Sequence, residues 1–211
     1  MHINSMENIN FSLIDDSVKI GENVVIKPFC IIKGDTIIES NTIIENFTYI
    51  ENSHIGSNCK ISNSHIENSF IENNVEIGPY TKIIKECIIK DNAIIGNFVE
   101  IKNSSIGSKT KIKHHTYVGD SIIGEECNIG CGVVFANYNG KTKNKIIIKD
   151  NVFVGSNSVL IAPLTIEDNC YICASTNLTK SLEEGSFVIG RSRETIKSGI
   201  ARKYLKKYKE K

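Results

Sequence analysis

The sequence lacks a strong excess of charge, a long apolar run and a leader-like start. Its 25 lysines and arginines against 24 aspartates and glutamates leave a net charge of +1, which argues against a bulk electrostatic partner such as nucleic acid. No run approaches the roughly 18 apolar residues of a membrane span, and Met1–Ser5 has no charged stretch followed by an apolar one. We therefore expect a cytoplasmic protein with no nucleic-acid partner and no membrane span.

The one locally basic segment is the C-terminal end, Ala201–Lys211. Two interpretations stay open for it. It can be a solvated tail, or it can be a basic patch for a phosphate-rich ligand.

What the sequence does contain is a ladder of aliphatic residues, most of them isoleucine, spaced six residues apart. With a few five-residue steps, this aliphatic ladder runs through Ile20, Ile26, Ile32, Ile38, Ile44, Ile50, Ile71, Ile77, Ile83, Ile89, Ile95, Ile101, Ile106, Ile112, Val118, Ile123, Ile129 and Phe135, and then through Ile148, Val154, Leu160, Ile166, Ile172 and Leu178. A period of six fits neither an α-helix nor a long alternating strand, so it indicates an internal repeat. One gap, from Phe135 to Ile148, is wider than the others.

The repeat predicts an all-β fold, a parallel β-helix of hexapeptide repeats. Two inward side chains per hexad, with polar residues between them, suit a short strand followed by a tight corner. Three hexads make one triangular coil, and stacked coils form parallel sheets on three faces. We expect about nine coils over residues 20–180, with a projecting loop at 136–147. Residues 1–19 are expected to cap the first coil, and 181–211 to form a connector and basic tail with a short helix or an extended end.

Seven cysteines raise the alternatives of a disulfide framework and, at Cys170–Cys173, a zinc site. Five of them stand four places after a ladder residue: Cys30, Cys59, Cys87, Cys127 and Cys170. Other coils place valine or threonine in that slot, so these cysteines are interpreted as small core residues. A lone Cys-X-X-Cys without a second pair is weak evidence for a metal, and no metal is expected.

The aliphatic ladder also predicts which polar residues lie above one another. If successive coils begin at Ile95, Ile112, Ile129, Val154 and Ile172, the residues two places further on form a column of Asn97, His114, Cys131, Ser156 and Ala174. With coils about 4.8 Å apart, His114 to Ala174 spans about 14 Å. Histidine is the usual general base near neutral pH, and a column of small residues beside it suits a thin ligand such as a pantetheine arm. The alternative is that His114 and His115 form a polar corner pair without a function.

The wide gap in the ladder holds Ala136–Lys145, with an Asn-Gly turn and three lysines. Thirteen residues cannot fit on one six-residue face, so this segment must project. An exposed loop on a rigid scaffold is a good place for a binding group, and a tolerated insertion is the alternative.

Several ordered motifs carry a resemblance to a known family. They are Gly96-Asn-Phe-Val-Glu100, His114-His-Thr-Tyr-Val-Gly-Asp120, Asn128-Ile-Gly-Cys-Gly132, Asn137-Tyr-Asn-Gly140, Val152-Phe-Val-Gly-Ser156 and Gly190-Arg191. From Gly78 to the C-terminus the chain resembles the acetyltransferase domain of the bacterial bifunctional glucosamine-1-phosphate acetyltransferase and N-acetylglucosamine-1-phosphate uridyltransferase. That domain is a left-handed β-helix. General crossover rules predict the opposite hand, so the handedness is expected from the resemblance alone.

The resemblance implies an N-acetyltransferase of UDP-N-acetylglucosamine and cell-wall biosynthesis that uses acetyl-CoA as co-substrate and no metal. His114 would deprotonate the amine of glucosamine-1-phosphate for attack on the thioester, with support from Glu100. The residues that would hold the sugar phosphate are Lys102, Tyr117, Asn128, Asn137, Tyr138 and Lys143. Those that would contact acetyl-CoA are Cys131, Ser156, Ala174 and Arg191. Members of the family are trimers with sites between subunits, so a homotrimer is expected.

Two departures from the family limit this prediction. The family's Gly-rich, Arg-containing nucleotidyltransferase loop does not occur here, so uridylyl transfer is not expected from this chain. The family's phosphate-binding Arg is replaced by Ile84, and Lys82 or Lys85 could compensate without the bidentate fork of Arg. The open alternatives are a different amino-sugar or nucleotide-linked acceptor, and a non-catalytic β-helix that binds sugar nucleotides or partners a separate pyrophosphorylase.

Overall fold

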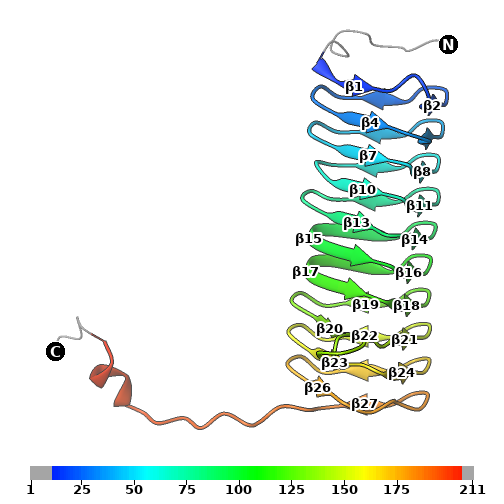
Figure 1. Cartoon of the computed structure of the whole chain (residues 1–211). Helices are drawn as coiled ribbons and strands as arrows, with labels where there is room; N and C mark the ends of the chain where they lie inside the picture. The colour runs from blue at the N-terminus through cyan, green and yellow to red at the C-terminus, as the bar shows by residue number, and fades with distance from the viewer. Residues whose placement is uncertain (1–10, 206–211) are drawn as a thin grey trace.

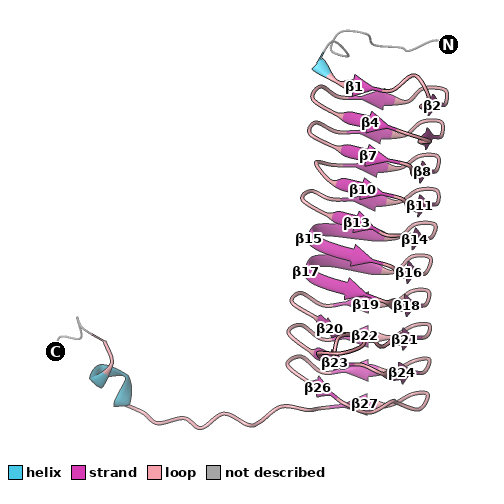
Figure 2. Ribbon diagram, in the orientation of Figure 1, coloured by secondary structure: helices cyan, strands magenta, loops and turns pink. Residues whose placement is uncertain are grey.

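A computed structural model describes residues 11–205 of the chain, which form a three-sided prism of stacked coils followed by an extended C-terminal segment (Figure 1). Almost all regular structure is short parallel strand (Figure 2). Each coil contributes one strand to each of three faces, and apart from the end coils every strand hydrogen-bonds to the coils before and after it.

Face 1 is formed by β3 (Val25–Ile26), β6 (Ile43–Ile44), β9 (Lys60–Ile61), β12 (Glu76–Ile77), the first parts of β15 (Ile94–Lys102) and β17 (Lys111–Gly119), β19 (Asn128–Ile129), β22 (Phe153–Val154), β25 (Tyr171–Ile172) and β27 (Phe187–Val188). Face 2 is formed by β1 (Leu13–Ile14), β4 (Ile31–Lys33), β7 (Tyr49–Glu51), β10 (His65–Glu67), β13 (Lys82–Ile84), the second parts of β15 and β17, β20 (Val134–Ala136), β23 (Val159–Ile161) and β26 (Asn177–Leu178).

Face 3 is a nine-stranded sheet. It is formed by β2 (Lys19–Ile20), β5 (Ile37–Ile38), β8 (His54–Ile55), β11 (Phe70–Ile71), β14 (Ile88–Ile89), β16 (Ser105–Ile106), β18 (Ser121–Ile123), β21 (Ile146–Ile148) and β24 (Leu164–Ile166). Faces 1 and 2 join into one larger sheet because β15 and β17 run through the corner between them without a break. These are the long strands of the fold, with nine residues each.

The aliphatic ladder fills the interior of the prism, as predicted. From Ile32 to Leu178 its residues are buried, and Phe135 is the largest of the fully buried side chains. The slot four places after the ladder is buried as well, including Cys30, Cys59, Cys87, Cys127 and Cys170, whereas Cys131 is exposed and Cys173 half-buried. The predicted coil register is confirmed, because Ile95, Ile112, Ile129, Val154 and Ile172 pair in sequence on face 1. Branched aliphatic residues suit this position because they pack well on pleated, buried strands.

Parallel pairing extends beyond residues 20–180 at both ends. Leu13 pairs with Ile31 at the start, and Val188 pairs with Ile172 at the end. After β27 the chain leaves the prism and forms one short 3-10 helix, η2 (Ile200–Lys203). The rest of the predicted N-terminal cap and of the basic tail, residues 1–10 and 206–211, lies outside the described residues. No helix in the described part is long and apolar enough to cross a membrane.

The buried cysteines give the fold a predicted sensitivity to alkaline pH. Burial raises the pKa of the Cys59 thiol from 9.0 to about 11, and it raises the pKa of Cys30, Cys87 and Cys127 as well. Above pH 9 the thiols lose their protons in the unfolded chain but keep them in the folded chain. The free energy of unfolding is therefore unaffected by these thiols below pH 9 and falls as the pH rises toward 11.

We therefore expect a lower thermal midpoint at pH 10 than at pH 8, with Cys59 contributing about 1 kcal/mol of the loss. Valine occupies the same slot at Val24 and Val75, so Cys59→Val should fold and should show a smaller decline. An equal decline in Cys59→Val and wild type would exclude Cys59 as a cause.

Candidate active site

The candidate base lies where the two long strands turn the corner between faces 1 and 2. β15 and β17 pair along their length, with Asn97 beside His114. Nδ1 of His114 lies 2.9 Å from Oδ1 of Asn97. An amide oxygen only accepts a hydrogen bond, so Nδ1 donates and Nε2 is left free to take a proton. The side chain of His114 is exposed, so Nε2 is open to a substrate.

Small side chains continue this corner in the following coils. Cys131, Ser156 and Ala174 each stand two places after a paired ladder residue, so they follow His114 in the predicted column. All three are exposed. The backbone confirms the stacking: the Asn157 amide donates to the Cys131 carbonyl and the Ser175 amide to the Ser156 carbonyl, each at 2.8 Å.

Gly155 and Arg191 both contact the backbone of Ala174 at the end of this column. A Cβ on Gly155 would lie 2.3 Å from the backbone nitrogen of Ala174, so glycine is needed where these coils approach each other. At the far end, Nη1 of Arg191 donates a hydrogen bond of 2.9 Å to the carbonyl of Ala174. The corner therefore carries an exposed strip of small residues between an imidazole and a guanidinium group.

A second polar group lies at the other edge of face 2, around Asp120. The carboxylate of Asp120 accepts hydrogen bonds of 2.6 Å from Asn103 and from Asn137, and Nζ of Lys143 lies 3.8 Å away. Asn137 is buried although it starts the projecting loop. Asp120 therefore ties the loop to the prism, and this connecting role was not predicted from the sequence.

Tyr117 and Asn137 meet over Gly119. A Cβ added to Gly119 would lie 2.4 Å from the Tyr117 hydroxyl and 2.7 Å from Nδ2 of Asn137, so only glycine leaves room for both side chains. Two of the predicted sugar-phosphate residues, distant in sequence by a full coil, are thus brought together.

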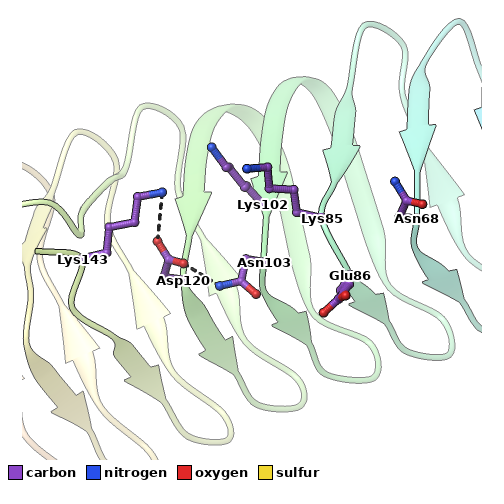
Figure 3. A pocket seen from close by; sticks show the side chains of 7 residues that line it. All are labelled: Asn68, Lys85, Glu86, Lys102, Asn103, Asp120 and Lys143. Atoms are coloured by element: carbon purple, nitrogen blue, oxygen red, sulfur yellow. Dashed lines mark hydrogen bonds and ion pairs between the residues drawn. The ribbon is translucent and has the colours of Figure 1, made fainter.

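Lys102 and Lys143 line one recess of about 450 Å³ at this edge, together with Asn68, Lys85, Glu86, Asn103 and Asp120 (Figure 3). Ile84 pairs with Lys102 on the neighbouring strand and is half-buried. It presents no polar atom to the recess, whereas Lys85, the next residue, lines it.

The remaining predicted residues lie apart from these groups. Glu100 is exposed on face 2, between Lys82 and Tyr117 in the strand register, and within the described residues the imidazole of His114 contacts Asn97 instead. Asn128 lies on face 1 beside Lys111. Tyr138 is exposed on the loop, and its hydroxyl donates to the Gly140 carbonyl at 2.8 Å. The sequence places Asn97 in the column, but its contact with His114 was not foreseen.

Within residues 11–205, no group of three or more His, Cys, Asp or Glu side chains is arranged to hold a metal ion. The groups described above that could hold a ligand are the imidazole, the strip of small side chains and the lysine-lined recess.

The coil architecture and the repeats define a left-handed parallel β-helix of the hexapeptide-repeat class. Residues 17–52 match the bacterial transferase hexapeptide repeat. A UDP-N-acetylglucosamine acyltransferase from Arabidopsis superposes with a TM-score of 0.67 and 19% identity, over 87% of this chain and 71% of that one. The acyltransferase of the same name from Bacteroides fragilis gives 0.59 and 22%, over 84% and 69%. The predicted fold and hand are therefore correct.

Within this class, residues 65–188 match the family described as the GMPPB C-terminal domain, and the chain belongs to that family. Curated relatives include the bifunctional protein GlmU of Caldicellulosiruptor saccharolyticus, 44% identical over 91% of this chain and 42% of the relative. GlmU of Clostridium novyi is 47% identical over 74% of this chain and 34% of the relative. The chain thus spans less than half the length of the curated relatives it matches.

Proposed function

We propose that this chain is an acetyl-CoA-dependent N-acetyltransferase that acetylates the amine of glucosamine-1-phosphate on the way to UDP-N-acetylglucosamine. The observation that carries the proposal is the His114 corner, where an imidazole of fixed tautomer ends a strip of small residues closed by Arg191. The identity of 44% to a GlmU over most of this chain supports the same reaction.

In the proposed reaction, the amine nitrogen attacks the thioester carbonyl carbon while Nε2 of His114 accepts the proton that the amine loses. The new C–N bond forms, the C–S bond breaks, and the proton passes from the imidazolium to sulfur, which yields the amide and free CoA thiol. A positioned general base of this kind contributes roughly 10²–10⁴-fold to the rate, and alignment of the two substrates contributes further.

The acetyl-CoA arm is proposed to lie along Cys131, Ser156 and Ala174, with Arg191 at the far end. The strip is about 14 Å long at the usual coil spacing, which fits an extended pantetheine arm with its thioester at His114. Cys131 adds an exposed thiol to this strip.

The sugar phosphate is proposed to contact Lys102, Tyr117, Asn128, Asn137, Tyr138 and Lys143, with Glu100 next to Tyr117 on the same face. Within one copy, His114 and the lysines of the recess lie at opposite edges of face 2, which β17 crosses over about 10 Å from Thr116 to Gly119. The amine and the phosphate of the substrate sit on adjacent ring carbons, so one copy cannot hold both groups of one sugar. A homotrimer in which His114 of one copy faces the lysines of the next would bring both groups to one sugar.

A thiol-release assay with acetyl-CoA and a panel of amino sugars tests this function. Turnover with glucosamine-1-phosphate is expected. Turnover only with another amino sugar or a nucleotide-linked sugar would keep the acetyl transfer and identify that sugar as the acceptor. No turnover with any acceptor would leave a non-catalytic binding protein. Light scattering on the same sample tests the homotrimer against a monomer.

The contact between Asn97 and His114 leads to a specific prediction about pH. Asn97→Ala removes the acceptor that fixes the tautomer, so we expect the turnover number to fall about 10-fold with little change in KM. Asn97→Asp places a carboxylate beside the ring and favours the protonated imidazole. The acid limb of the pH–rate profile should then move to higher pH. A purely structural role for Asn97 would lower the thermal midpoint in both variants and leave the profile in place.

A further inference from the structure

At the edge between faces 2 and 3, the corner at Lys85 differs from those of the two adjacent coils. Neighbouring coils turn this edge with a single residue of positive φ, such as Asn68, Asn103 and Asp120. By contrast, Lys85 and Glu86 both have positive φ, 64° and 58°. They are the only adjacent pair of this kind between residues 11 and 205. The ladder advances six residues here, from Ile83 to Ile89, but five in the coils on either side, so this corner is one residue longer than its two neighbours.

Lys85 is exposed at this longer corner. Left-handed backbone is unfavourable for residues that carry a side chain, and such strain at a surface site is a reason to look for a function. The recess of about 450 Å³ lies at this point, and Lys85, Lys102 and Lys143 all line it.

Of the three lysines that line the recess, two have no partner for their positive charge among the described residues. The carboxylate of Asp120 is occupied by Asn103, Asn137 and Lys143. The side chains of Lys85 and Lys102 make no hydrogen bond or ion pair within the described residues. In Figure 3 their ammonium groups point to the same side, and the carboxylate of Glu86 is turned away from them. Two ammonium groups beside a neutralised carboxylate form a site for a small anion.

We propose that Lys85 supplies the positive charge that Ile84 does not, in the recess where the proposed function already places the sugar phosphate through Lys102 and Lys143. The inference rests on the proposed function and deepens it by naming a specificity-determining residue. An ammonium group offers three donors to phosphate oxygens, as a point charge in place of a bidentate fork. Lys102 adds a second cation from the neighbouring strand, so the recess selects an amino sugar that carries a phosphate monoester.

The test is the kinetics of Lys85→Ala with glucosamine-1-phosphate and acetyl-CoA. KM for the sugar phosphate is expected to rise about 10-fold or more, which corresponds to the loss of a charge-assisted hydrogen bond. The turnover number and KM for acetyl-CoA should stay close to wild type, and Lys85→Arg should restore the sugar KM. Lys60 is exposed on face 1 and away from this edge, so Lys60→Ala is the matched control and should match wild type. An unchanged sugar KM in Lys85→Ala overturns the proposal.

Calorimetry separates this inference from the proposed function. The wild-type chain is titrated with glucosamine-1-phosphate, with glucosamine and with inorganic phosphate, and the titrations are repeated with Lys85→Ala. Lys85-dependent binding of the phosphorylated sugar without acetyl transfer would keep the phosphate site and reject the enzyme. Acetyl transfer with binding that does not depend on Lys85 would keep the enzyme and reject the site. Equal binding of glucosamine and its phosphate, or no binding of either, rejects the site as well.

Discussion

Replacing His114 by alanine is expected to lower acetyl transfer by about 10²–10⁴-fold, the range that a positioned general base contributes. Nδ1 is held by Asn97 at 2.9 Å, so Nε2 is the nitrogen left to act as the proposed base. Alanine leaves no group at this corner to take the proton from the attacking amine. The strip of Cys131, Ser156 and Ala174 is untouched, so KM for acetyl-CoA should change little. The measurement is thiol release at saturating substrates, followed across pH.

The adjacent histidine provides the matched control. His115 is exposed, its ring lies 5.0 Å from that of Phe98, and its φ of 42° suits asparagine. His115→Asn should therefore keep the corner and lose less than about threefold in turnover, far below the effect of removing a general base. If wild type is no more active than His114→Ala across the panel of amino sugars, the enzyme assignment fails. Equal losses in the two variants would point to the corner as a whole and not to the imidazole.

The sequence was sufficient for the fold because six-residue spacing imposes a geometry that local propensity does not. Each ladder residue must lie above the one three hexads earlier, so Ile95, Ile112 and Ile129 stack as predicted. The same geometry placed His114 in line with Ser156 and Ala174. The hand of the coil does not follow from this spacing, since either hand stacks the same residues.

Details of the site were not predictable because they depend on side-chain directions between coils. Asn97 was in the predicted column, but only the structure shows its amide oxygen against the imidazole. The role of Asp120 depends on how the loop returns to the prism. The six-residue step at Lys85 can be read from the sequence, but only the structure shows that Lys85 lines a recess together with Lys102 and Lys143.

The largest expected effect on stability comes from a buried ladder residue in the middle of the prism. Ile123 is 2% exposed and pairs with Ile106 and Ile148 on face 3. Ile123→Ala leaves a cavity between close-packed coils and is expected to cost about 2–5 kcal/mol. The preceding residue of the same strand, Ile122, is 46% exposed. Ile122→Ala removes the same atoms from the outside of the prism and should cost less than about 1 kcal/mol. Urea and thermal midpoints of the two variants make the comparison.

Ile123→Ala and His114→Ala together separate the effects on stability from the effects on turnover. Ile123 points into the prism from face 3, whereas His114 is exposed at the corner between faces 1 and 2. Well below its midpoint, Ile123→Ala should retain wild-type turnover and KM, and His114→Ala should retain the wild-type midpoint. Because coils contact only their neighbours, a weak coil in the middle can split unfolding into two steps, so fluorescence and circular dichroism should be followed together. Equal midpoints for Ile122→Ala and Ile123→Ala would contradict the buried ladder as the source of stability.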